Sequence, residues 1–218
     1  MIGTRRALDL AVAVPATILT APVVGALALA IKLDSPGPVL YRQVRVGLDG
    51  RHFRICKLRS MVVGAEFIGA GLAVEADDDR ITRVGRLLRR YSLDELPNLW
   101  NVVSGDMAIV GPRPTVPVQV DQYTERQRGR LAVRPGLTGW AQVNGRASLL
   151  WPERIELDLW YVDHRSLLLD LRILAETLRM VVAGHGLYHR GEGGGWIPPA
   201  AEPDDRLSHA EASGHNDP

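Results

Sequence analysis

The longest apolar stretch of the chain lies near its N-terminus, where no charged side chain occurs from Leu10 to Ile31. As one α-helix this stretch would be about 33 Å long, enough to cross the hydrocarbon core of a bilayer. Pro15 and Pro22 lie inside it, and a proline within a helix removes a backbone hydrogen bond and bends the chain. The pattern therefore predicts a long, bent, apolar helix.

The residues that flank this helix leave three interpretations open. Arg5 and Arg6 precede it, and Lys32, Arg42 and Arg45 follow it. Two arginines before an apolar run are typical of a twin-arginine signal peptide. A simple spanning helix is the second interpretation, but positive charge on both flanks gives it no clear inner end. A re-entrant helix that returns to the side it entered resolves this conflict, and the flanks favour it.

After a Ser-Pro-Gly-Pro turn the pattern predicts shorter elements. Residues 39–46 alternate as a strand, 48–51 form a hairpin turn, and 53–58 continue as a second extended segment. The other expected elements are a short helix and loop over 62–79, an amphipathic helix over 80–91, a buried helix over 98–103, a strand over 107–110, a surface helix over 119–131, a glycine-rich loop over 134–146, and helices over 151–161 and from Leu167, the last capped by Ser166.

Composition narrows the classes of function. A length of 218 residues suits one domain with appendages. A net charge of +1 and 6% aromatic residues argue against a base-stacking nucleic-acid surface. Cys56 is the only cysteine, which excludes a disulfide framework and a cysteine-based metal site. Lys32 and Lys57 are the only lysines, so the basic groups are almost all guanidinium, which favours bidentate phosphate contacts.

The candidate chemistry lies where two neighbouring acids, Asp94 and Glu95, stand among arginines. Four arginines lie between positions 83 and 90, and Arg113 follows within a Pro-Arg-Pro segment that limits its backbone freedom. Adjacent acids are costly to bury unless cations balance them. The arrangement suits a site for phosphate and a divalent metal, although a surface Asp-Glu pair in a loop explains most such dipeptides.

Other basic residues extend this set. Lys57 and Arg59 close the second extended segment and are expected to point into a site, whereas Arg42 and Arg45 fit contacts with anionic headgroups near a membrane exit. Arg146 ends the segment R-P-G-L-T-G-W-A-Q-V-N-G-R, whose glycines let the backbone approach a ligand. Its spacing fits neither a P-loop nor a dinucleotide fingerprint.

Seven segments occur in one order: R-R-A-L-D, D-S-P-G-P-V-L-Y-R-Q, K-L-R-S-M, S-L-D-E-L-P-N-L-W-N-V, G-D-M-A-I-V-G-P-R-P, P-G-L-T-G-W-A-Q-V-N-G-R and E-L-D-L-W-Y-V-D. Together, from Arg5 to about Leu187, they resemble the bacterial sugar transferase family, the small monotopic phosphoglycosyl transferases that act on polyprenyl phosphate. The family's helix commonly breaks at Ser-Pro; here Ala21-Pro22 stands at that place, without the hydroxyl.

The resemblance implies a mixed, helix-rich α/β fold. Residues 1–33 would form a re-entrant membrane anchor, and residues 34–190 a catalytic domain on the cytosolic face of the inner membrane. This domain would contain a small antiparallel sheet and amphipathic helices that lie on the membrane surface. The Gly-, Pro- and acid-rich residues 191–218 are predicted to be a disordered tail.

The resemblance also implies a reaction. A sugar-1-phosphate would pass from a UDP-sugar to undecaprenyl phosphate, with Mg²⁺ bound and UMP released, as the first membrane step of polysaccharide or glycoconjugate synthesis. Asp94 would be the nucleophile, forming an aspartyl-phosphosugar intermediate, and Glu95 would join it in holding Mg²⁺ or assist the acceptor. The candidate phosphate and nucleotide contacts are Lys57, Arg59, Arg89, Arg113 and Arg146.

Membrane lipids are further expected partners, nucleic acid is not, and downstream glycosyltransferases and a second copy of the chain are candidates. Two alternatives remain. A membrane-anchored glycosyltransferase would release UDP instead of UMP, and a catalytically dead scaffold of a polysaccharide assembly complex would release neither. The Asp-Glu pair and Pro-Arg-Pro argue against the scaffold, which needs neither motif. The sequence does not distinguish a hexose from an N-acetylated amino sugar.

Overall fold

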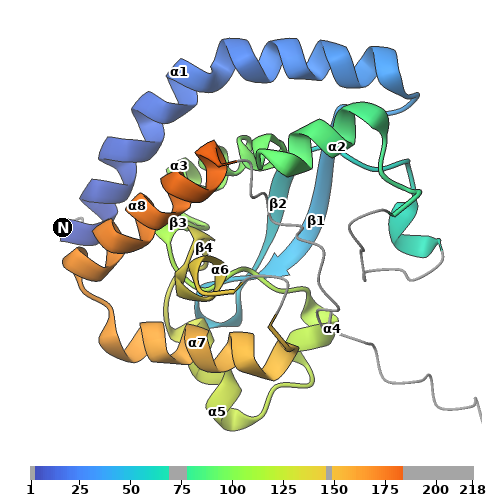
Figure 1. The fold of residues 1–218 in the computed structure, drawn as a ribbon. Helices are drawn as coiled ribbons and strands as arrows, with labels where there is room; N and C mark the ends of the chain where they lie inside the picture. Colours follow the sequence, from blue (N-terminus) through green and yellow to red (C-terminus); the bar gives the residue numbers. More distant parts are fainter. Residues whose placement is uncertain (1–2, 69–77, 146–148, 184–218) are drawn as a thin grey trace, which may run out of the picture.

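One long helix, α1 (Thr4–Asp34), runs along the outside of a helix-rich body (Figure 1). The computed structural model describes residues 3–68, 78–145 and 149–183. Pro15 and Pro22 both lie inside α1, and Figure 1 shows that the helix bends over their part of the chain, as prolines in a helix interior require. The predicted long, bent helix is therefore confirmed.

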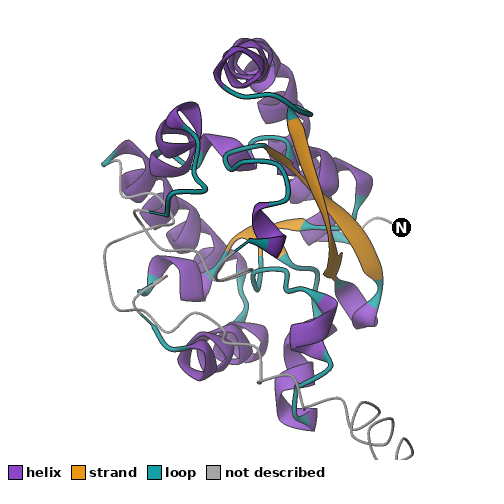
Figure 2. Ribbon diagram, turned by 90° about the vertical axis from the view of Figure 1, so that its right-hand side faces the viewer, coloured by secondary structure: helices purple, strands orange, loops and turns teal. Residues whose placement is uncertain are grey.

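A hairpin of β1 (Leu40–Val46) and β2 (His52–Leu58) stands beside the helices (Figure 2). The strands pair antiparallel, with Leu40 opposite Leu58 and Val46 opposite His52. The turn between them is the 3₁₀ helix η1 (Leu48–Gly50), in which Asp49 has a left-handed φ of 53°. The predicted strands, the turn and the small antiparallel sheet are confirmed.

A second pair of strands was not predicted in full. β3 (Ala108–Val110) lies where a strand was expected, but β4 (Gly136–Thr138), its parallel partner, falls in the predicted glycine-rich loop. The two segments approach so closely that a Cβ on Gly136 would lie 2.1 Å from the Gly111 nitrogen. The glycines therefore serve strand pairing here, and a strand of three residues is too short to show a period of two.

The prediction of a single surface helix over 119–131 is wrong. Two short helices, α4 (Pro117–Val120) and α5 (Glu125–Arg128), are followed by η4 (Gly129–Ala132). Thr124 ends the first segment and starts a new helix, because its side chain and that of Gln127 form a capping box. Nor does this region lie only on the surface, since Tyr123 and Arg130 are buried.

The remaining helical elements follow the predictions more closely. α2 begins after Thr82, whose hydroxyl accepts a hydrogen bond from the Gly85 amide at 2.9 Å. Ser166 caps the last helix, where its Oγ accepts from the Leu169 amide. These elements are η2 (Ala65–Phe67), α2 (Arg83–Arg90), η3 (Leu93–Glu95), α3 (Asn98–Ser104), α6 (Trp140–Val143), α7 (Trp151–His164) and α8 (Leu167–Val182).

The main hydrophobic core lies where α1, α3, α7 and α8 meet the two strand pairs, and Ile55, Val102, Met107 and Tyr161 are buried in it. Ile173 is the buried residue of α8. Leu174 of α8 packs against this core, whereas Leu171 and Leu178 of the same helix are 63% and 66% exposed. The predicted tail, residues 191–218, lies outside the described residues.

Candidate functional site

Asp94 and Glu95 are buried together in the 3₁₀ turn η3, where they are 3% and 6% exposed. Ser92 precedes them with a left-handed φ of 54°, which reverses the chain after α2 and turns both acids inward. In the described part of the chain the Ser92 side chain makes no capping hydrogen bond. The alternative of a surface Asp-Glu pair in a loop is thus excluded.

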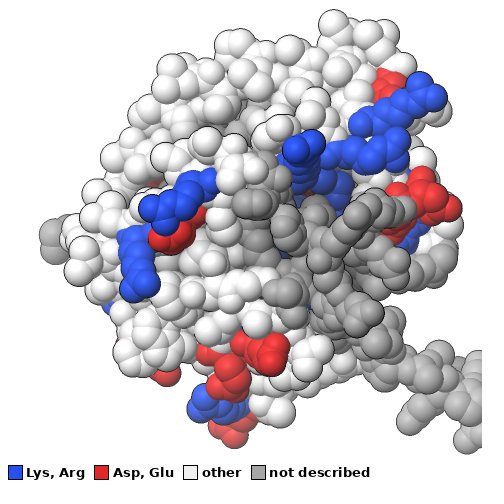
Figure 3. Space-filling view, in the orientation of Figure 1, with Lys and Arg blue, Asp and Glu red and all other residues white. Residues whose placement is uncertain are grey.

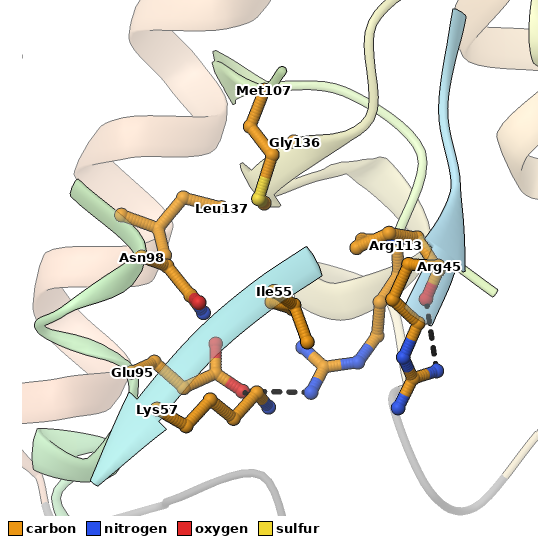
Figure 4. Close-up of a pocket in the computed structure, with 10 residues that line it drawn as sticks. Arg45, Ile55, Lys57, Glu95, Asn98, Met107, Arg113, Gly136 and Leu137 are labelled. Carbon is orange, nitrogen blue, oxygen red and sulfur yellow. Dashed lines mark hydrogen bonds and ion pairs between the residues drawn. The ribbon is translucent and has the colours of Figure 1, made fainter. Parts of the chain in front are cut away.

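Two cations hold Glu95 (Figure 4). Its Oε1 accepts hydrogen bonds from Lys57 Nζ at 2.8 Å and from Arg113 Nη2 at 2.7 Å. Lys57 comes from β2, and Arg113 from the Pro-Arg-Pro segment that follows β3. Burial raises the pKa of Glu95, but the charges of Arg113 and Lys57 outweigh burial and lower that pKa to about 2. Glu95 is therefore ionised at neutral pH.

Asp94 is in a different electrostatic state. Burial raises the pKa of this carboxyl to about 6; Lys57 lowers the pKa and the neighbouring charge of Glu95 raises it. Its Oδ1 has no hydrogen-bond partner among the residues that the structure describes. A desolvated carboxylate with a raised pKa and an unused oxygen is suited to act as a nucleophile or a base.

The structure places the predicted basic residues unequally around these acids. Lys57 and Arg113 contact Glu95 directly, and the buried Arg89, in the last turn of α2, lowers the pKa of Asp94 by its charge. Arg59 is not brought to the acids: its guanidinium donates to the carbonyls of residues 35 and 36 and so fixes the segment after α1. Arg146 lies outside the described residues.

A pocket opens beside Glu95, Lys57 and Arg113 (Figure 4). Arg45 and Asn98 also line it, and neither was predicted to do so. Strand alternation contains the signal for Arg45, because the hairpin register puts positions 41, 43 and 45 on the same face as 53, 55 and 57. The sequence contains no comparable signal for Asn98. The remaining lining residues are Ile55, Met107, Pro114, Gly136 and Leu137.

A buried polar network lies behind the Pro-Arg-Pro segment. Arg130 forms an ion pair with Asp158 of α7, donates to the hydroxyl of Tyr123, and donates from Nη2 to the Arg113 carbonyl at 3.0 Å. The Tyr123 hydroxyl in turn donates to Thr115 Oγ1 at 3.2 Å. The network therefore supports the backbone that presents Arg113 to Glu95.

The acids can be tested against the ligand preferences of Mg²⁺. Over residues 3–68, 78–145 and 149–183, no group of three or more His, Cys, Asp or Glu side chains gathers around one point. Mg²⁺ is usually bound by one or two carboxylates together with substrate phosphates and water. Asp94, with its unpartnered Oδ1, and Glu95 therefore fit a magnesium ion that is completed by a phosphorylated substrate.

Comparison with known proteins points to one family. Residues 2–184 match the profile of the family described as bacterial sugar transferase. The chain is 42% identical over 183 residues to the uncharacterized sugar transferase EpsL of Bacillus subtilis, a match that covers 84% of this chain and 89% of EpsL. It is 44% identical over 193 residues to the UDP-glucose:undecaprenyl-phosphate glucose-1-phosphate transferase of Caulobacter vibrioides, covering 84% of this chain and 72% of that protein.

A third relative is longer. The UDP-N-acetylgalactosamine-undecaprenyl-phosphate N-acetylgalactosaminephosphotransferase of Aeromonas hydrophila is 43% identical over 188 residues. The match covers 84% of this chain and 44% of that protein, so the chain corresponds to less than half of it.

Proposed function

The chain belongs to the bacterial sugar transferase family, and we propose that it transfers a sugar-1-phosphate from a UDP-sugar to undecaprenyl phosphate and releases UMP. The names of the relatives from C. vibrioides and A. hydrophila describe transfer of this kind, with glucose and N-acetylgalactosamine respectively. The observation that carries the proposal is the buried Asp94, whose pKa is about 6, beside a Glu95 that holds two cations.

In the proposed mechanism Asp94 is the nucleophile. Its carboxylate oxygen forms a bond to the phosphorus that bears the sugar, and the bond from that phosphorus to the UMP oxygen breaks, so that UMP leaves with the electron pair. An oxygen of undecaprenyl phosphate then attacks the same phosphorus and releases the Asp94 carboxylate. A covalent intermediate of this kind divides one displacement into two. The dry surroundings of Asp94 favour the first step, because they leave its carboxylate poorly solvated.

The cations around the acids have a clear task in this reaction. Lys57 and Arg113 face the pocket and share one oxygen of Glu95, so a bound diphosphate can draw on both for charge-assisted hydrogen bonds. Mg²⁺, when bound, supplies positive charge that neutralises the diphosphate and favours departure of UMP. Asp94 and Glu95 are the residues that would hold it.

The proposal includes a re-entrant membrane anchor. α1 is long and apolar enough to cross a bilayer, and its uncharged surface forms the upper edge of the molecule in Figure 3. Both of its ends are attached to the same body: Asp9 Oδ1 accepts from the Ile109 amide at 2.9 Å, and Asp34 Oδ2 from the Val84 amide at 3.1 Å. Between them Leu19 is 77% exposed.

Because both ends are attached to one body, we favour a bent helix that enters one leaflet and returns to the same side. A helix that crosses to the far side would place its ends on opposite faces of the membrane. The exposed leucines of α8, a helix that lies beside the first half of α1 in Figure 1, would then rest at the same membrane surface. We place the body at the cytosolic face of the inner membrane, where UDP-sugars are supplied.

The nucleotide product tests this proposal. Detergent-solubilised protein is given Mg²⁺, undecaprenyl phosphate and one UDP-sugar at a time from a panel of hexoses and N-acetylated amino sugars. Release of UMP with a single donor supports the proposal and identifies the sugar. Release of UDP moves the protein to the class of glycosyltransferases that transfer sugar without phosphate, and a scaffold releases no nucleotide at all.

A further inference from the structure

Asn98 is a buried polar residue that the proposed mechanism does not use. It is 1% exposed, follows Glu95 by three positions, and lines the same pocket as Lys57, Glu95 and Arg113 (Figure 4). Its Oδ1 finds no hydrogen-bond partner within the described ranges. A buried carbonyl oxygen without a partner destabilises the folded protein, and such atoms are rare. Its presence in the pocket therefore requires an explanation.

A second asparagine of the same helix shows what a structural role requires. Asn101 is also buried, at 6% exposure, and both ends of its carboxamide are paired with the backbone of β2. Its Nδ2 donates to the Arg54 carbonyl at 2.8 Å, and its Oδ1 accepts from the Cys56 amide at 3.1 Å. Asn101 joins α3 to the hairpin, whereas the oxygen of Asn98 has no hydrogen-bond partner among the described residues, and the Asn98 side chain lines the pocket.

The chemistry of the unused atom restricts the ligand. Oδ1 is an acceptor, so a ligand group that forms a hydrogen bond with it must carry an O–H or N–H group. The diphosphate oxygens of a UDP-sugar are unprotonated acceptors at neutral pH, and Lys57 and Arg113 already offer donors to them. The phosphorus that Asp94 attacks is bonded through oxygen to two groups, the sugar and the other phosphate. The sugar carries hydroxyl or amide hydrogens close to this phosphorus, whereas the other phosphate carries none.

We infer that Asn98 is a substrate-contact residue, whose side-chain oxygen accepts a hydrogen bond from a hydroxyl or amide N–H group of the transferred sugar. The inference rests on the proposed function and deepens it. Asn98 then contributes to the choice of sugar, because a polar group left unpaired in a site discriminates strongly against a donor that lacks the matching group.

Matched substitutions separate this role from a structural one. Leucine branches at Cγ as asparagine does but has no polar atom, so Asn98→Leu removes an unpaired oxygen, and thermal unfolding should occur at the same or a higher temperature. Asn101→Leu leaves the Arg54 carbonyl and Cys56 amide unpaired, and its Tm should fall. With the donor identified by UMP release, kcat/KM of Asn98→Leu should fall about 10- to 100-fold, the loss expected for one hydrogen bond to a buried acceptor.

Deoxygenated donors locate the contact. UDP-sugars that each lack one hydroxyl or the acetamido group are compared on the wild type and on Asn98→Leu. One analogue should lower kcat/KM of the wild type about 10- to 100-fold and should be used by Asn98→Leu no worse than the complete donor. Inhibition by UDP, which lacks the sugar, should be the same for both proteins.

Several results would overturn the inference. The first is a Tm of Asn98→Leu as low as that of Asn101→Leu with kcat/KM unchanged. The second is that every analogue lowers kcat/KM of Asn98→Leu by the same factor as it lowers kcat/KM of the wild type. The third is that Asn98→Leu weakens inhibition by UDP as much as it lowers kcat/KM for the donor. Failure of the proposed function is seen separately, as absence of UMP from the wild type. In that case we compare how much the same UDP-sugars raise the Tm of the wild type and of Asn98→Leu. Equal rises in Tm for the two proteins would show that Asn98 does not contact the sugar.

Discussion

Arg130 and Asp158 form a buried ion pair. Removing one of the two side chains should lower the free energy of unfolding strongly, whereas replacing both by apolar side chains should change it little. The two side chains are 4% and 2% exposed, so water cannot solvate either charge when its partner is removed. Arg130 also supports the carbonyl of Arg113, and its guanidinium lies over the ring of Tyr123 at 5.6 Å. Removing either partner leaves the other charge buried alone.

The size of the effect follows from this burial. Breaking a buried pair by removing one partner costs about 3–5 kcal/mol. For a chain of this length each kcal/mol lowers Tm by roughly 2–4 °C, so Arg130→Met should lower Tm by roughly 6–20 °C. The double variant Arg130→Met, Asp158→Leu leaves no unpaired charge and should recover most of this loss, since apolar replacements of buried pairs are often neutral or stabilising.

The single variant should also acquire a pH dependence. Burial raises the pKa of Asp158 even though Arg130 opposes this rise. Without Arg130 the folded-state pKa increases further above that of the unfolded chain, so the folded state binds a proton more tightly. Arg130→Met should therefore gain stability as pH falls from about 8 to about 5, and the double variant should lack this extra pH dependence.

Thermal unfolding in detergent, followed by circular dichroism at these two pH values, measures all three effects. A cost of Arg130→Met below about 1 kcal/mol would contradict this prediction. So would a loss in the double variant that equals the sum of the losses in Arg130→Met and Asp158→Leu. A pH dependence of Arg130→Met that matches the wild type would show that Asp158 does not become the unpaired charge.

Three further predictions concern the nucleophile, a helix and the anchor. Because the pKa of Asp94 is raised to about 6, UMP release in a single turnover without acceptor should increase as pH rises through about 6 and then level off; a flat profile from about pH 5 to 7 contradicts this. Gly85→Ala should lower Tm despite the better helix propensity of alanine, because its Cβ would lie 1.9 Å from the Ser60 carbonyl oxygen, whereas Gly25→Ala, with open space around it, should not. In a Cys56→Ser background, Thr4→Cys and Leu33→Cys should both be labelled by an impermeant thiol reagent in inverted vesicles and neither in spheroplasts; labelling of one from each side would indicate a spanning helix.

The features with a long or strong local signal could be predicted from the sequence. The uncharged run of α1 and the alternation of the hairpin each extend over many residues, so their signal does not depend on distant partners. The sequence also indicates that two adjacent acids need nearby cations if they are buried, and Lys57 and Arg113 meet this need at Glu95.

The features that escaped prediction depend on contacts between distant parts of the chain. Arg59 follows the last residue of β2, so alternation no longer fixes its direction, and its guanidinium turns to carbonyls at the end of α1. The sequence does not distinguish Asp158 from Glu153 and Glu156 on the same helix, because only the fold brings Arg130 to Asp158. The strand β4 was missed because its partner lies 28 residues away in a separate segment.

The central claim is that Asp94 becomes covalently attached to the sugar phosphate. Wild-type protein and Asp94→Asn are incubated with the donor UDP-sugar and Mg²⁺ in the absence of undecaprenyl phosphate, and the mass of the intact protein and the UMP released are measured together. We predict that the wild type gains one sugar-phosphate group on the peptide containing Asp94, releases one equivalent of UMP, and loses the group when undecaprenyl phosphate is added. Asp94→Asn should gain no group and release no UMP. Transfer to the lipid by Asp94→Asn at the wild-type rate, or attachment of the group to another residue, would contradict it.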